Sequence, residues 1–130
     1  MGAFDLLNIA SSSMGFHQTW LDALANNIAN VNTATSTSEN AFQAQYVVAQ
    51  AKPGGGVQVA GVVEGDPTGR VVNDPDSPLA DADGNVREPD IDMSSQMTQL
   101  VMAQRGFQAS VQVTKDAQET YESALSIGRG

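Results

Sequence analysis

The sequence predicts a mainly α protein with a small β part. Its long N- and C-terminal helices pair as an antiparallel, coiled-coil-like hairpin, with a short β-hairpin and an acidic, proline-rich loop between them. Apolar residues recur every seven positions near both ends of the 130-residue chain, which is typical of paired helices. Two short valine-rich runs flank three consecutive glycines, and nine of the 15 acidic residues lie within residues 64–92. We therefore divide the chain into an N-terminal helix (1–32), a middle region (33–92) and a C-terminal helix (93–130).

The N-terminal helix is predicted over residues 4–31, a stretch without proline. A helix of 28 residues is about 42 Å long, well beyond the usual globular helix. The seven-residue series is Leu7, Met14, Leu21 and Ile28, and the partner series three residues on is Ala10, His17, Leu24 and Val31.

The C-terminal helix is predicted over residues 93–127. Asp92 stands in position to cap its first turn, and Gly128 can end it. Its seven-residue series is Met93, Leu100, Phe107, Thr114 and Tyr121, and the residues that widen the stripe are Met97, Ala103, Val111, Ala117, Ala124 and Leu125.

The middle region differs in kind from the two ends. Residues 45–50 and 57–64 read as strands, and the glycines at 54–56 read as their hairpin connection. Residues 70–72 offer a third strand. Residues 73–92, with three prolines and many aspartates, read as an ordered or semi-ordered loop.

Large apolar side chains are scarce. Leu, Ile, Val and Phe together make up 28 of the 130 residues, close to the level at which chains become disordered. Alanine and serine along the helices let backbones approach closely but bury little area. One helical hairpin of this quality is only marginally stable, so the composition itself points toward assembly with neighbouring subunits.

Charge and composition exclude several function classes. The formal net charge of −9 disfavours nucleic acid and anionic membrane surfaces as partners, and no apolar run is long enough for direct membrane insertion. The chain has no Cys and one His, which argues against thiol chemistry and multi-histidine metal sites. No basic residue precedes Lys52, so no cleavable signal peptide of the usual kind is expected. We predict no enzyme activity and no cofactor.

A calcium loop beginning at Asp81 is the main metal alternative. An EF-hand starting there needs Gly at position 86 and Glu at position 92, whereas the chain has Val86 and Asp92. The aspartates of this stretch are better explained as turn formers.

The string from Leu24 to Thr33 contains four asparagines within seven residues, an unusual density for a helix. Asn30 or Asn32 can cap the helix end. Asn26 and Asn27 have a second interpretation: their amides donate and accept at once, and could fix the register of a neighbouring subunit.

Residues 25–33, Ala-Asn-Asn-Ile-Ala-Asn-Val-Asn-Thr, resemble the N-terminal signature of the bacterial flagellar rod and hook proteins. Residues 74–86 and 89–92 resemble the corresponding stretch of the FlgC family of proximal rod proteins, and so does the Ala-Gln-Arg-Gly-Phe-Gln-Ala-Ser of residues 103–110.

This resemblance implies a structural role, in which the chain would assemble with copies of itself and other flagellar rod subunits in a helical tubular array that carries motor torque to the hook. It implies a place in the flagellar basal body, in the rod that crosses the periplasm, next to basal-body and export-gate proteins at the rod base. It also implies export by the flagellar type III system without a cleaved signal peptide.

The seam and the asparagine string supply our candidate subunit-interface residues: Leu7, Met14, Leu21, Leu24, Asn26, Asn27, Ile28, Asn30, Leu100, Arg105, Phe107, Val111 and Tyr121. Two alternatives stay open, a sibling axial protein of the rod or hook and, further off, a small acidic calcium-binding module.

Overall fold

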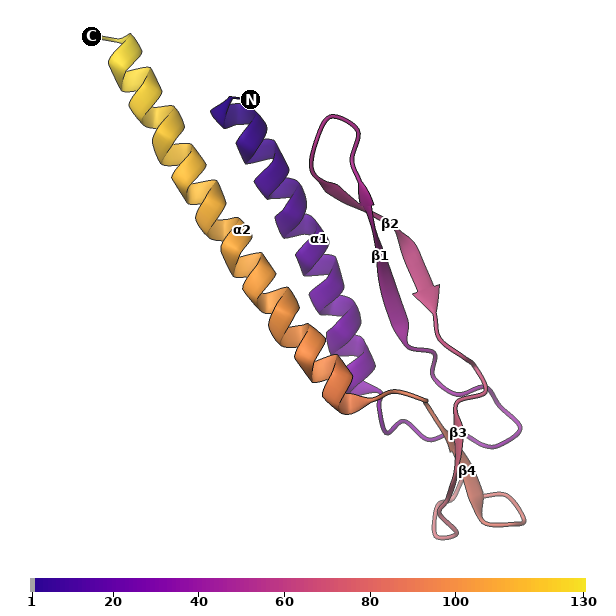
Figure 1. The fold of residues 1–130 in the computed structure, drawn as a ribbon. Helices are drawn as coiled ribbons and strands as arrows, with labels where there is room; N and C mark the ends of the chain where they lie inside the picture. Colours follow the sequence, from indigo (N-terminus) through magenta and orange to yellow (C-terminus); the bar gives the residue numbers. More distant parts are fainter. Residues whose placement is uncertain (1) are drawn as a thin grey trace. The chain divides into compact units, whose positions relative to one another are not determined.

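The computed structural model describes residues 2–130, apart from the side chain of Ala3. Along the chain, a long helix comes first, two small β-hairpins follow, and a second long helix comes last, so the predicted mainly α class with a small β part is confirmed (Figure 1). The elements in order are α1 (Ala3–Ala29), β1 (Gln45–Ala51), β2 (Val57–Glu64), β3 (Arg70–Asn73), β4 (Asn85–Glu88) and α2 (Met93–Gly128). Along the described part of the chain, neither helix is long and apolar enough to cross a membrane.

The chain forms two compact units. Unit 1 contains the chain up to Leu21, Val47–Gly61 and Val101–Gly130. Unit 2 contains Asp22–Tyr46 and Val62–Leu100. Each helix therefore contributes one part to each unit.

In unit 1, α1 and α2 pack antiparallel, which confirms the predicted pairing (Figure 1). The Ser13 and Ser110 hydroxyls lie 2.8 Å apart, and the Thr114 hydroxyl lies 3.6 Å from the sulfur of Met14. The His17 ring lies directly against Gly106, where any Cβ would collide with it. His17 Nδ1 also lies 2.7 Å from the Ser13 carbonyl oxygen, which fixes the ring in that place.

The buried residues of this seam are small. Ala103, Ser110 and Ala117 on α2 follow at seven-residue intervals and are 0%, 7% and 1% exposed. The predicted period is therefore present, but the series built on Phe107 and Tyr121 is not the buried one. Small side chains let the two backbones approach closely, and the larger apolar side chains are left at the flanks of the seam.

The first hairpin joins β1 to β2 through the three glycines, as predicted. Gly54, Gly55 and Gly56 all have positive φ, between 87° and 106°, a conformation that other residues rarely adopt. The loop also lies close to α1, because the Val57 N–H donates to the Ser12 hydroxyl at 3.1 Å. A Cβ on Gly56 would collide with that same hydroxyl.

The second hairpin pairs β3 with β4 antiparallel, with Arg70 opposite Glu88 and Asn73 opposite Asn85. The sequence analysis places residues 85–88 in a loop, which is wrong, because the structure makes them strand β4. The strand holds one apolar residue, Val86, which is 1% exposed. One buried valine gives too short an alternation for a strand to stand out in the sequence.

The core of unit 2 is compact and small. Val31, Ala44 and Ile91 are buried together, with Phe42 packed against them. Around it the backbone is held by Arg87, whose guanidinium donates to the carbonyl oxygens of Thr68 and Thr37. Polar clamps of this kind compensate for the small buried apolar area.

Both helices end close to the predicted positions. α1 stops at Ala29, two residues before Val31, and the Asn30 side chain donates to the Asn26 carbonyl oxygen at 2.9 Å. The Asn30 side chain thus gives the Asn26 carbonyl oxygen a second hydrogen bond beside that of the Asn30 N–H, in agreement with its predicted role at the helix end. At the start of α2, the Asp92 carboxylate accepts the Ser94 N–H at 3.2 Å, as an N-cap does.

Candidate subunit interface

Asn27 holds three segments of unit 2 together. Its side chain is fully buried. Its amide nitrogen donates to the Gln45 carbonyl oxygen (2.9 Å) and to Gln96 Oε1 (3.0 Å), and its oxygen accepts the Gln45 N–H at 2.8 Å. The last turn of α1, the first residue of β1 and the first turn of α2 are therefore joined by one side chain.

The neighbouring asparagines of the string, Asn26 and Asn30, are more accessible than Asn27. Asn26 is exposed and makes a long 3.3 Å hydrogen bond to the side chain of Gln45. The Asn30 amide donates to Asn26 Oδ1 at 3.2 Å, and the Thr33 hydroxyl donates to Asn30 Oδ1 at 3.1 Å. These amides form a hydrogen-bonded ladder that remains within reach of a neighbouring molecule.

The candidate interface residues differ in how accessible they are. Two are buried inside the chain, Leu24 and Asn27. Eight are half-buried, namely Leu7, Met14, Leu21, Ile28, Asn30, Leu100, Phe107 and Val111. Three are exposed, namely Asn26, Arg105 and Tyr121.

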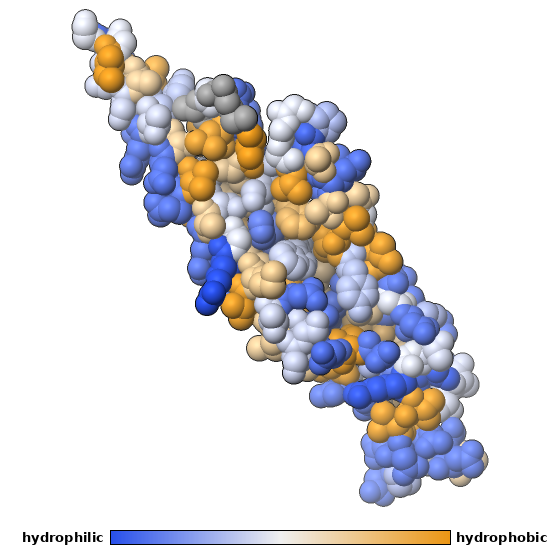
Figure 2. All heavy atoms as spheres, in the orientation of Figure 1, coloured by the Kyte–Doolittle hydropathy of each residue, from blue (hydrophilic) through white to orange (hydrophobic). Residues whose placement is uncertain are grey.

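Large apolar side chains that the sequence analysis did not single out are also exposed on the helices of unit 1. Phe4 is 65% exposed, Met102 57% and Ile127 82%, and Val101 is 44% exposed. Hydrophobic side chains gather in patches on the face seen in Figure 2. Helices with this much exposed apolar surface are typical of proteins that bury it against other subunits.

A groove of about 370 Å³ lies along the α1–α2 seam of unit 1. It has no acidic residue, lysine or arginine in its lining. The lining residues are Leu6, Ile9, Ala10, Ser13 and His17 from α1, and Gly106, Ala109, Ser110 and Val113 from α2.

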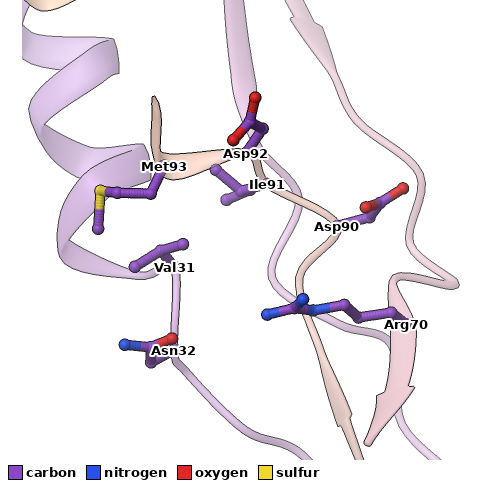
Figure 3. A pocket seen from close by; sticks show the side chains of 7 residues that line it. All are labelled: Val31, Asn32, Arg70, Asp90, Ile91, Asp92 and Met93. Atoms are coloured by element: carbon purple, nitrogen blue, oxygen red, sulfur yellow. The ribbon is translucent and has the colours of Figure 1, made fainter. Parts of the chain in front are cut away.

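A second cavity, of about 570 Å³, opens in unit 2 beside the start of α2 (Figure 3). Its lining residues are Val31, Asn32, Arg70, Asp90, Ile91, Asp92 and Met93. Figure 3 shows Val31, Ile91 and Met93 together on one side, with Arg70 and Asp90 on the other. Arg70 is engaged in an ion pair with Glu88 at 3.2 Å. The side chains that line this cavity do not include a Ser, Thr, Cys, Lys or His.

The Asp81 loop is a turn. The Asp81 carboxylate accepts the N–H groups of Asn85 (2.9 Å) and Asp83 (3.0 Å) and the hydroxyl of Thr37 (2.9 Å). These hydrogen bonds lower the pKa of Asp81 below its ordinary value, and the one from the Asn85 N–H has the largest effect. Among the described residues no three His, Cys, Asp or Glu side chains are grouped to hold a metal ion.

Sequence reasoning missed the partners that give these residues their roles. Gln45 and Gln96 complete the Asn27 cluster, and Arg87 fixes the loops of unit 2. Gln96 did carry a signal, because a glutamine beside the apolar stripe of a helix needs a buried hydrogen-bond partner. Nothing local indicated that this partner would be Asn27, 69 residues away.

Comparisons with known proteins give the chain a family. The sequence profile described as flagellar basal body rod FlgEFG protein C-terminal matches residues 82–127. Flagellar basal-body rod protein FlgC of Salmonella typhimurium is 32% identical over 99% of this chain and 100% of its own length. FlgC of Yersinia enterocolitica is 33% identical with the same coverage, and FlgC of Bacillus subtilis is 27% identical, again over 99% and 100%. With full-length identity at this level joined to two long paired helices and a β middle, the chain belongs to the FlgC family of flagellar basal-body rod proteins.

Proposed function

We propose that this chain, a structural subunit of the flagellar basal-body rod, packs with copies of itself and with other rod subunits in a helical tubular array that passes motor torque to the hook. The observation that carries the proposal is the composition of the α1–α2 seam. Ala103, Ser110 and Ala117 fill it, while Met102 and Ile127 remain in water. Burial of the exposed apolar side chains by neighbouring subunits would supply the stability that one seam of small residues lacks.

The proposal gives each region a task. Residues 1–32 and 93–130 are the axial helices, which pack against equivalent helices, and residues 33–92 make lateral contacts and set the fit to particular neighbours. The accessible candidates Asn26, Arg105 and Tyr121 would touch other subunits directly. Leu24 and Asn27 are buried in the chain and would act by keeping the helix ends in shape.

The proposed location is the part of the rod that crosses the periplasm, with basal-body and export-gate proteins as neighbours at the rod base. The route there is the flagellar type III export system, without a cleaved signal peptide. Torque would pass through this array by many packed helix layers, because close-packed interiors deform little under load.

The test uses Met102→Asp in place of the native chain in motile bacteria. In the lone molecule this side chain is 57% exposed, so the change should leave the fold intact. In the array it would bury an unpaired carboxylate, which is strongly unfavourable. We expect normal cellular levels of the protein, few or no rods in electron micrographs of isolated basal bodies, and loss of swimming.

The matched control is Met102→Leu, which keeps the apolar surface and should swim normally. Cells carrying Met102→Asp that swim and contain normal rods would contradict the proposal. So would cells that lack the chain altogether and still build rods.

A further inference from the structure

This inference rests on the proposed function and concerns how copies of the chain meet. Its starting point is the C-terminal end of α2, which extends past the N-terminal end of α1 (Figure 1). The face of α2 that buries Ser110 and Ala117 in the seam continues, at helical spacing, to Tyr121 and Leu125. Beyond Ala117 this face of α2 is no longer covered by α1, and every residue from 118 to 130 is exposed. Tyr121 is 42% exposed and Leu125 45%.

The groove of unit 1 offers the complementary shape. Its lining combines small residues such as Ala10 and Gly106 with the larger apolar side chains of Leu6, Ile9 and Val113. An apolar pair at positions i and i+4 on a helix is the usual anchor for docking into such a groove. The occupant should be uncharged on its docking face, because the groove lining contains no acidic residue, lysine or arginine.

Charge indicates which surface of a second copy can approach. Unit 2 carries 11 acidic and two basic side chains, a formal charge of −9, which is the whole net charge of the protein. Unit 1 carries four of each sign and is neutral. Two copies can therefore approach through unit 1 without net repulsion, whereas contacts between two copies of unit 2 are opposed by like charge.

We propose that the C-terminal end of α2 of one copy, through Tyr121 and Leu125, docks in the α1–α2 groove of unit 1 of a second copy. The contact is heterologous, because a projecting end meets a groove and not its own equivalent. Contacts of this type leave one end and one groove free, so they propagate, giving a ring where the rotation between copies closes and an open helical array where it does not. Salt should strengthen the contact, because it screens the repulsion between the acidic units while the docked surfaces are apolar.

Disulfide trapping tests the contact on a clean background, because the chain has no Cys. Leu125→Cys and Val113→Cys are purified separately and oxidised alone and as a mixture. We expect covalent dimers in the mixture and several-fold fewer with either variant alone. The matched control replaces Val113→Cys by Gln112→Cys, its exposed neighbour outside the groove, and should trap several-fold less.

A second measurement does not depend on trapping. Sedimentation velocity should show self-association that rises with NaCl, and Leu125→Gln should weaken it about fivefold to tenfold, as expected from failing to bury the exposed half of a leucine. Circular dichroism of Leu125→Gln checks that α2 is retained.

Three results would overturn the proposal. They are equal trapping with the Gln112→Cys control, trapping of Leu125→Cys with itself as efficient as in the mixture, and association that weakens with salt. The second result would mean that two C-terminal ends pack on each other. Trapping in the purified mixture combined with normal rods in cells lacking the chain would remove the proposed function and leave the docking contact standing.

Discussion

Replacing Asn27 by alanine should unfold the cluster that joins the two helices to β1. The side chain is fully buried, and its loss leaves the Gln45 N–H, the Gln45 carbonyl and Gln96 Oε1 without their partner. Each buried group left unsatisfied costs about 1–3 kcal/mol. Because water can enter the space left by the amide and satisfy part of the loss, we expect about 3 kcal/mol for unit 2.

The assay follows the Gln45 amide, which donates directly to Asn27 Oδ1. A loss of about 3 kcal/mol corresponds to roughly hundredfold faster amide hydrogen exchange, provided that exchange follows the opening equilibrium. Heteronuclear NMR resolves this amide, and a lower urea midpoint should accompany the faster exchange.

The control is Asn26→Ala, the adjacent and exposed asparagine. It loses a single 3.3 Å hydrogen bond to the Gln45 side chain, which should cost less than about 1 kcal/mol. If Asn27→Ala and Asn26→Ala speed exchange at Gln45 equally, the cluster does not hold unit 2 together and our reasoning fails.

Two further predictions concern close packing and pH. Gly106→Ala should destabilise unit 1 by about 1–3 kcal/mol in urea unfolding, because the new Cβ collides with the His17 ring. The control is Gly15→Ala, whose Cβ meets nothing within 4 Å and which should be neutral or stabilising by up to about 1 kcal/mol. Urea midpoints that fall equally in the two variants would refute this prediction. Asp81 should titrate by NMR below the ordinary aspartate value of about 3.9, with the Asn85 amide following the same midpoint. Since its pKa is lowered on folding, the stability it contributes is present above that ordinary value and is lost as the pH falls through the folded value; a midpoint at or above the ordinary value would be inconsistent with the turn.

The features that the sequence predicted correctly depend on local signals. The heptad spacing through Leu7 and Leu100 predicted two long helices, and three consecutive glycines predicted the turn between β1 and β2. Asp92 was recognised as a cap, and Asn30 as one of two candidates beside Asn32, because capping depends on only a few neighbouring residues.

The features that were missed depend on distant partners. Tertiary pairing with β3 makes residues 85–88 a strand, although Val86 is the single apolar residue among them. Ala103 and Ala117 were placed correctly on the predicted stripe of α2, but the sequence pattern centred that stripe on large residues such as Phe107, whereas close packing of the two helices buries the small ones most deeply. Asn27 was recognised as unusual, but its partners lie 18 and 69 residues away and no local pattern identifies them.

The long separations within each unit also constrain when the molecule can acquire its shape. Ser13 meets Ser110 across 97 residues, and Asn27 meets Gln96 across 69. Contacts so far apart along the chain form slowly, since a large loop must close before they can stabilise anything. A polypeptide threaded N-terminus first through a narrow conduit could complete neither pairing until most of its length had emerged. The Ser13–Ser110 and Asn27–Gln96 contacts are therefore expected to be late events in the folding of this chain, after its helices have begun to form locally.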